Sequence, residues 1–189
     1  MRLISDLDFN RLLGAVNLAA PFGRRDHALL RLAALTGLRV GELVGLDVGL
    51  VWSCSCAPRE WLDLPAAIAK GGRSRRVPLS LAARRAVTEL VDFLRLRGFS
   101  VAPDAPLLCD RRHRRLPARE VQRMVQRLRE LADLDVRVTP HSFRHHFATS
   151  RVQKAPVHTV QQILGHRRLE STAVYLHASL DDLRAVVEA

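Results

Sequence analysis

The sequence predicts an α+β domain that is mostly α, with one small three-stranded antiparallel sheet among the helices. Apolar residues recur at helical spacing through most of the chain, and the segments that carry them begin at capping residues and end at glycine. That periodicity is lost between Val48 and Pro78, where short runs indicate strands. With 189 residues, 48% of them apolar, the chain is large enough for one well-cored domain and small for two. We therefore expect a single domain over residues 1–189.

The first helix is predicted to start after Ser5. The Ser5 and Asp8 side chains stand at the positions of a capping box, with Asp in the place of Glu. An apolar stripe then continues to about Ala20 and makes this helix a packing element. The stripe consists of Leu7, Leu12, Leu13 and Val16.

A second helix is predicted over residues 24–35, where apolar side chains cover most of the surface, and Thr36-Gly37 ends it. A short third helix starts near Arg39. Glu42 follows at the i+3 position, close enough to pair with the Arg39 guanidinium or to orient it. As an ordinary surface ion pair, these two side chains would stabilise the fold by less than about 1 kcal/mol.

Three strands are predicted, over residues 49–53, 61–69 and 74–79. Pro65 has no backbone N–H, so its strand is either an edge strand or interrupted there. The pair Gly71-Gly72 is suited to a hairpin turn and leaves Lys70 just before it, where a flexible ammonium can reach a ligand. Three basic side chains lie beside Lys70 and are candidates for DNA contact: Arg73, Arg75 and Arg76.

Two longer helices follow. Ser80 caps the first, which runs through Arg97, ends at Gly98 and carries no chemistry. The second begins at Pro117, after a basic run at residues 111–115, and continues to about residue 133. Its predicted apolar face consists of Val121, Met124, Val125, Leu128 and Leu131.

The opposite face of that second helix carries Arg119, Arg123 and Arg127 at i, i+4 spacing. Like charges so placed repel by a few tenths of a kcal/mol per pair, and an external anion relieves that repulsion. Arginine at every position favours phosphate, since the planar guanidinium binds two oxygens at once. The alternative is a solvated basic face without a ligand.

The segment from Thr139 onward concentrates polar groups suited to a phosphate. Thr139 is a good N-cap and Pro140 a good first helical residue, so His141 and Arg144 share one face in the first turns of a helix. Unpaired N–H groups and the positive end of the helix dipole add to the Arg144 guanidinium. This helix start is therefore a predicted anion site.

A further helix is predicted over residues 157–164, with Gly165 as its terminator and His166 just past it. Tyr175 follows nine residues later and is the only tyrosine in the protein. A last short helix is expected over residues 181–187. Any tyrosine chemistry therefore has one possible carrier.

The charge balance indicates a polyanionic partner. Thirty Lys and Arg against 19 Asp and Glu leave a formal net charge of +11, and the positive charge is clustered. We favour nucleic acid as this partner; the alternative is a soluble protein that is merely basic. A membrane surface lacks support, because no apolar run approaches the roughly 18 residues of a spanning helix and no signal-peptide core is present. We expect a cytoplasmic protein.

The three cysteines do not indicate a disulfide framework, because their number is odd and no export signal precedes them. A zinc set of Cys54, Cys56, Cys109 and His113 is conceivable, but its C-x-C spacing is tighter than structural zinc sites use. We expect reduced thiols and no metal.

Five motifs in order then resemble those of the tyrosine site-specific recombinases, the phage integrase family. Residues 36–43 resemble the family's first-arginine box around Arg39, and residues 70–79 its β-hairpin lysine box. Residues 141–144 match H-x-x-R, 164–166 match L-G-H, and 172–177 match the nucleophile box T-x-x-Y-x-H. Any one of these is weak alone, but together they cover most of the chain. Residues 54–58 fit no part of the family's pattern.

The resemblance implies the fold of DNA breaking-rejoining enzymes and site-specific cleavage and rejoining of double-stranded DNA. Its implied catalytic residues are Arg39, Lys70, His141, Arg144, His166 and Tyr175, with Glu42 and His177 in support. Tyr175 would attack the scissile phosphate to form a 3′-phosphotyrosyl link and free a 5′-hydroxyl. No metal or cofactor is implied, and the expected assembly is a homo-tetramer on DNA.

The residue types suit that chemistry. Attack on a phosphodiester adds negative charge to the nonbridging oxygens, and Arg39 and Arg144 stay protonated and can stabilise it. A tyrosine with an ordinary pKa near 10 becomes a nucleophile when its phenolate is stabilised by such cations. Lys70 is the implied general acid for the departing 5′-oxygen, and no nucleotide-binding glycine loop is present.

Three alternatives stay open at this point. A type IB topoisomerase-like enzyme would use the same residues to relax supercoiled DNA. The intact set of implied catalytic residues speaks against a catalytically silent DNA-binding module, and a helix-turn-helix regulator would leave the histidines without a role. The family's usual N-terminal helical domain is absent before Arg39, so we expect either a catalytic fragment or a short recombinase with weaker, more salt-sensitive DNA binding.

Overall fold

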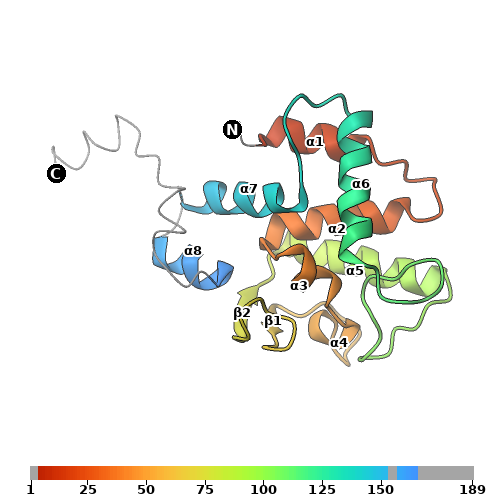
Figure 1. Ribbon diagram of the computed structural model, residues 1–189. Helices are drawn as coiled ribbons and strands as arrows, with labels where there is room; N and C mark the ends of the chain where they lie inside the picture. Colours follow the sequence, from red (N-terminus) through yellow and green to blue (C-terminus); the bar gives the residue numbers. More distant parts are fainter. Residues whose placement is uncertain (1–3, 153–156, 166–189) are drawn as a thin grey trace, which may run out of the picture.

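The computed structural model describes residues 4–152 and 157–165. His166, Tyr175 and His177 lie outside the described residues, as does the predicted helix over 181–187. The described part is mostly helical with one small antiparallel sheet, which is the predicted class in its coarse form (Figure 1).

The helical body is organised around α2 (Gly23–Thr36), which packs against α5 (Leu81–Leu96) and α7 (Pro140–Val152). Figure 1 shows α1 (Asp6–Gly14) on one side of this layer and the sheet on the other. Helix α6 (Ala118–Leu131) runs across the direction of α2 and contacts α1 and α7. These helices thus share one continuous core, in which Leu12, Leu29, Leu90 and Val125 are fully buried.

The N-terminal capping box is present as predicted. The Ser5 hydroxyl accepts a hydrogen bond from the Asp8 amide at 3.1 Å, and the Asp8 carboxylate accepts one from the Ser5 amide at 3.0 Å. The helix ends at Gly14, however, and does not continue to Ala20. The Asn17 side chain accepts from the Ala19 amide at 3.0 Å, and this local turn competes with the helical hydrogen bonds.

Gly37 ends α2 as predicted, and its conformation is required there. Its φ of 63° is left-handed, and its amide donates to the Ala33 carbonyl at 3.0 Å. A Cβ on Gly37 would lie 2.6 Å from Cδ1 of Phe147 on α7. Glycine therefore both terminates α2 and lets α7 approach it closely.

The sheet has two strands within the described residues, not three. Strand β1 (Trp61–Leu64) pairs antiparallel with β2 (Arg75–Pro78), with Leu62 opposite Val77. Leu62, Leu64 and Val77 are buried, so one face of the sheet closes the core, with α4 beside β1. The second predicted strand stops at Leu64 because Pro65 cannot donate to the ladder.

The strand predicted over residues 49–53 is wrong, because α4 (Val48–Val51) occupies this place. Val48 and Val51 stand at i, i+3 and are both buried, and this spacing puts them on one face of a helical turn but on opposite faces of a strand. The amides of Val48 and Gly49 donate to the carbonyls of Ala105 and Pro103, so they are satisfied outside any sheet. Trp52 forms only an isolated bridge, to Pro58.

The Gly71-Gly72 pair lies in a longer connection than the tight hairpin turn that the sequence predicts. Residues 65–74 join the two strands, and both glycines have positive φ, 91° and 67°. Ile68 and Ala69 form a turn on Pro65 through its carbonyl. Lys70 therefore stands in an exposed loop at the end of the sheet.

The later helices agree closely with the sequence. Ser80 caps α5 through a hydrogen bond of 3.2 Å from the Ala83 amide, and α7 begins at Pro140. Helix α6 buries Val121, Val125 and Leu128 of its predicted apolar face, whereas Met124 is partly buried and Leu131, in the last turn, is exposed. No helix of residues 4–152 and 157–165 is long and apolar enough to cross a membrane.

Helix α8 (Val157–Leu164) stands apart from the main core. Its Val160 and Leu164 form a separate small apolar cluster with Phe147 and Ala148 of α7. Gly165 follows with a φ of 66°, as a helix terminator. Ile163 packs against the main core as well, so the end of α8 is held by apolar contacts on both clusters, to which polar contacts are added.

Candidate active site

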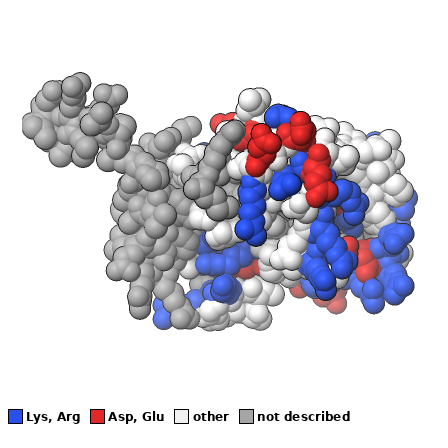
Figure 2. Space-filling model, turned by 45° about the horizontal axis from the view of Figure 1, so that its top comes forward, with Lys and Arg blue, Asp and Glu red and all other residues white. Residues whose placement is uncertain are grey.

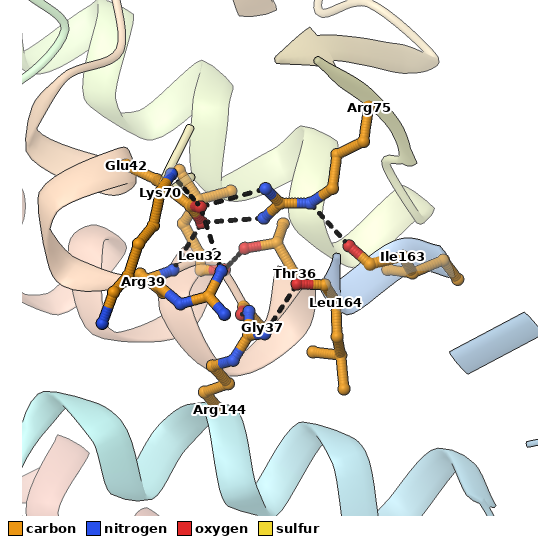
Figure 3. A network of polar contacts seen from close by, with 10 residues as sticks. All are labelled: Leu32, Thr36, Gly37, Arg39, Glu42, Lys70, Arg75, Arg144, Ile163 and Leu164. Atoms are coloured by element: carbon orange, nitrogen blue, oxygen red, sulfur yellow. Dashed lines mark hydrogen bonds and ion pairs between the residues drawn. The ribbon is translucent and has the colours of Figure 1, made fainter. Parts of the chain in front are cut away.

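Glu42 is the centre of a polar network between α3 (Val40–Val44), the sheet and α8 (Figure 3). It is 1% exposed. Its carboxylate accepts hydrogen bonds from the Arg39 amide at 2.9 Å, the Lys70 amide at 3.3 Å and both terminal nitrogens of Arg75 at 2.9 and 2.7 Å. One buried anion thus joins the start of α3 to the Lys70 loop and to β2, 28 and 33 residues later.

The local sequence explains why Glu42 takes this position. Arg39 is the N-cap residue of α3, with an extended backbone, and Glu42 is the third helical residue. A carboxylate there reaches back to the N-cap amide and lies at the positive end of the helix. The Arg39 guanidinium also pairs with Glu42 at 3.3 Å, as the i+3 spacing predicts.

Burial raises the pKa of Glu42, but its hydrogen bonds to Arg75 and the Arg39 amide, the Arg75 charge and the Lys70 amide outweigh burial. The pKa of Glu42 is lowered to about 2. The side chain is therefore an anion under all ordinary conditions. It fixes Arg39 without removing it from solvent, since the Arg39 side chain is 24% exposed.

Arg144 is 1% exposed and is held by main-chain oxygens. Its Nη1 donates to the Gly37 carbonyl at 2.8 Å, and its Nη2 donates to the Leu164 carbonyl at 2.6 Å. These carbonyls end α2 and α8, where helix dipoles are negative. Figure 3 shows Arg144 and Arg39 reaching toward one another from opposite sides, so α7 and α3 bring two permanent positive charges to one place.

His141 lies near these cations. Burial lowers the pKa of His141, and the charges of His145, Arg144, Arg39 and Lys70 lower it further. The rings of His141 and His145 meet edge to face, with centroids 4.3 Å apart. Burial and Arg144 lower the pKa of His145 too. His141 is therefore a neutral imidazole near pH 7, able to accept a proton.

Lys70 combines a fixed backbone with a mobile side chain. Its amide is held by Glu42, while its side chain is exposed. Figure 3 shows that side chain extending beside Arg39. An ammonium on this exposed chain can approach a ligand over the site.

The basic residues after Lys70 separate in the structure. Arg73 is exposed, and Arg76 points to the outer face of the sheet, where it contacts Asp63 at 3.2 Å and covers the Trp61 ring. Arg75 faces inward and has 10% of its side chain exposed. Arg75 therefore lies within the network and not on the surface.

Sequence reasoning missed this inward position, although a signal for it exists. Strand side chains alternate between faces, so the burial required of Val77 also turns Arg75 inward and Arg76 outward. The carbonyls of Gly37, Ile163 and Leu164 were missed as well. Main-chain acceptors leave no mark in the sequence.

The α6 arginines are exposed, as expected, but are not equivalent. Arg123 pairs with Glu120 at 2.7 Å on the surface. Arg127 lies near Asp26, whose pKa burial raises and the charges of Arg25 and Arg127 partly lower. Arg127 also lines a cavity of about 920 Å³ beside the start of α2. Figure 2 shows basic side chains over much of one face, with acidic ones between them.

The described residues hold no cluster of three or more His, Cys, Asp or Glu side chains arranged for a metal ion. Cys54 and Cys56 are exposed, whereas Cys109 is buried, with its thiol donating to the Pro106 carbonyl. The structure thus brings together Arg39, Glu42, Lys70, His141 and Arg144 from the predicted set, with Arg75 added. His166, Tyr175 and His177 are outside the described residues.

Comparison with known proteins gives one consistent result. The profile of the Phage integrase family matches residues 3–181. Tyrosine recombinase XerC of Salmonella typhi is 34% identical over 187 residues, which cover 96% of this chain and 57% of that protein. The XerC of Escherichia coli O127:H6 is 33% identical over 187 residues, which cover 96% of this chain and 58% of that protein. The chain therefore spans somewhat more than half the length of each of these relatives.

Solved structures share the fold. The XerA recombinase is 28% identical, with a TM-score of 0.76, and the match covers 100% of this chain and 65% of that one. A XerH site-specific recombinase bound to its difH substrate gives a TM-score of 0.76 at 21% identity, over 98% of this chain and 53% of that one. At 21% identity, the similarity to XerH shows a shared fold and nothing more.

Proposed function

Because the chain belongs to the phage integrase family, we propose that it is the catalytic part of a site-specific recombinase that cleaves and rejoins double-stranded DNA. The observation that carries this proposal is the pair of guanidinium groups, Arg39 and Arg144, held in place beside a neutral His141. The relatives are longer than this chain, so the activity of a whole recombinase is part of the proposal.

The fixed arginines serve the electrostatics of phosphoryl transfer. In the transition state, charge grows on the nonbridging oxygens of the scissile phosphate, and cations already in position stabilise it without reorganising. Glu42 holds Arg39, and main-chain carbonyls hold Arg144, so neither arginine needs the substrate to order it. The partial exposure of Arg39 leaves it open to a DNA backbone.

In the proposed reaction, the Tyr175 oxygen forms a bond to phosphorus as the bond to the 5′-oxygen breaks. The phenolic proton goes to a neutral histidine such as His141, and Lys70 supplies a proton to the 5′-oxygen. His166 completes the cage around the phosphate, with His177 and Glu42 in support. The bond energy is kept in the phosphotyrosyl link, so rejoining by a 5′-hydroxyl needs no nucleotide cofactor and no metal.

The proposed partner is double-stranded DNA, bound by a homo-oligomer that reaches a tetramer during strand exchange. The net charge of +11 and the exposed arginines Arg73, Arg76, Arg119, Arg123 and Arg127 suit a phosphate backbone. The XerH structure is a complex with its DNA substrate, and a lambda integrase structure is a dimer bound to a core site. A chromosomal or plasmid substrate would place this protein in the cytoplasm.

Covalent trapping tests the proposal. A nicked suicide DNA prevents rejoining, so a 3′-phosphotyrosyl adduct accumulates and migrates as a larger species in a denaturing gel. We expect an adduct with the parent protein and none with Tyr175→Phe. An adduct of equal yield from Tyr175→Phe would show that another residue is the nucleophile. Sequencing the captured DNA then identifies the preferred site.

A further inference from the structure

Two arginines from different elements hold the last carbonyls of α8. Arg75 of β2 donates from Nε to the Ile163 carbonyl at 2.8 Å, and Arg144 of α7 donates to the Leu164 carbonyl at 2.6 Å. Carbonyls at a helix C-terminus have no helical partner and carry negative partial charge. Both guanidinium groups therefore satisfy acceptors at the point where the chain leaves α8.

From this arrangement we propose that Arg75 is a positioning residue: it joins Glu42 to the end of α8 and so fixes the start of the segment that carries His166 and Tyr175. In this role Arg75 does not contact DNA. The inference rests on the proposed function, since it concerns where the nucleophile is delivered.

All three guanidinium nitrogens of Arg75 donate hydrogen bonds: Nη1 and Nη2 to the Glu42 carboxylate, and Nε to the Ile163 carbonyl. The side chain is 10% exposed. A Cβ added at Gly165 would lie 3.0 Å from Cδ of Arg75, so the terminator of α8 packs directly on this side chain. Few donors and little surface remain for a phosphate.

The attachment of α8 makes this contact important. Its apolar contacts with the described part of the protein are the small cluster formed with Phe147 and Ala148 and the packing of Ile163 against the main core. Arg75 is also the first residue of β2, which directly follows the loop that contains Lys70. The Arg75 side chain thus links the loop that contains Lys70, the polar network around Glu42 and the C-terminal end of α8.

The substitution Arg75→Lys tests this role. Lysine keeps the charge, but a single ammonium cannot reach both Glu42 oxygens and the Ile163 carbonyl in the planar geometry of arginine. We expect adduct formation on the suicide DNA to slow by about 10- to 100-fold, because a misplaced reacting group costs that much. DNA affinity and its salt dependence should stay within about twofold of the parent, since no phosphate contact is lost.

A matched control is Arg31→Lys. Arg31 also donates twice to a glutamate, Glu89, at 2.6 and 2.8 Å, but on the exposed surface between α2 and α5. This variant should form the adduct at the parent rate. Hydrogen exchange gives a readout independent of catalysis: Arg75→Lys should speed exchange of amides in residues 157–165 and leave α5 unchanged.

If Arg75→Lys does not fold, the pair Glu42→Gln and Glu42→Gln/Arg75→Met replaces it, because both lack the buried carboxylate and they differ only in the presence of Arg75. Addition of Arg75→Met should then slow adduct formation at least tenfold beyond Glu42→Gln alone. Unchanged adduct formation, or a loss that follows DNA affinity, overturns the positioning role. A parent protein that forms no adduct would instead refute the proposed function, while the exchange result still tests the contact.

Discussion

Arg75 and Arg123 each pair with a glutamate at 2.7 Å, yet the two ion pairs lie in opposite surroundings. Arg75 is 10% and its partner Glu42 1% exposed, whereas Arg123 is 56% and its partner Glu120 48% exposed. Water and salt screen the surface pair, which contributes less than about 1 kcal/mol. In the buried pair, removal of either partner leaves an uncompensated charge in the interior.

The comparison separates two uses of arginine in one basic protein. In the network around Glu42, the Arg75 guanidinium is a structural part that holds other groups in place. On α6, the same group is held loosely and stays available to an external anion. Burial of the partner, and not the distance between the charges, distinguishes the two.

The largest expected effect comes from Glu42→Ala. It leaves Arg75 buried without its carboxylate and frees Arg39, so the free energy of unfolding should fall by about 3–5 kcal/mol. Glu120→Ala, at the surface pair, should lower it by less than about 1 kcal/mol. Urea denaturation of the two variants measures both values. Equal losses would mean that burial does not separate the pairs.

The pH dependence of stability sharpens the same contrast. The folded pKa of Glu42, about 2, is below its ordinary value of 4.5, so the unfolded chain takes up this proton first. Stability from this group is full above pH 4.5 and is lost as the pH falls toward 2, by roughly 3 kcal/mol. The difference in unfolding free energy between the parent and Glu42→Gln should therefore shrink over this window. A constant difference would show that the buried carboxylate has an ordinary pKa.

A backbone substitution tests the main-chain half of the network. Gly37→Ala puts a Cβ 2.6 Å from Phe147 and forces alanine to a φ of 63°, so it should destabilise the fold by about 1–3 kcal/mol. It also displaces a carbonyl that Arg144 uses. Gly14→Ala is the control, because a Cβ added at Gly14 would meet nothing within 4 Å outside its own helix, and Gly14 ends a helix. Gly14→Ala should be neutral or slightly stabilising. Thermal melting measures both variants, and a lower melting temperature for Gly14→Ala than for Gly37→Ala would contradict the prediction.

The features predictable from the sequence are those set by neighbouring residues. The Ser5 cap, the start of α7 at Pro140 and the end of α8 before Gly165 depend on groups a few positions apart. The pairing of Arg39 with Glu42 follows from one turn of helix in the same way. Local physics is enough for such elements.

What the sequence did not reveal depends on contacts between distant segments. The helix at Val48–Val51 is fixed by carbonyls of the 103–105 segment, so its short apolar run on its own predicts a strand. The sequence alone groups Arg75 with its exposed neighbours, because its partners, Glu42 and Ile163, are 33 and 88 residues away. Gly37 and Leu164 belong to recognisable motifs, but nothing in those motifs shows that their main-chain carbonyls hold Arg144, 107 and 20 residues away.

The smallest effect on folding, and the sharpest contrast with Arg75, is expected on α6. Arg119→Gln and Arg123→Gln remove exposed charges, so each should change the free energy of unfolding by less than about 0.5 kcal/mol. If these side chains bind phosphates, each substitution should reduce the slope of log affinity against log salt by about 1.

Arg95→Gln on α5 is the matched control for Arg123→Gln. Arg95 faces Asp92 at i, i+3 on the surface, as Arg123 faces Glu120, and its loss removes the same charge. A salt slope that falls equally for Arg95→Gln would mean that only net charge matters. A fall confined to the α6 variants would locate the phosphates on α6. Together with an unchanged slope in Arg75→Lys, it would assign DNA contact to the loosely held arginines and positioning to the buried one.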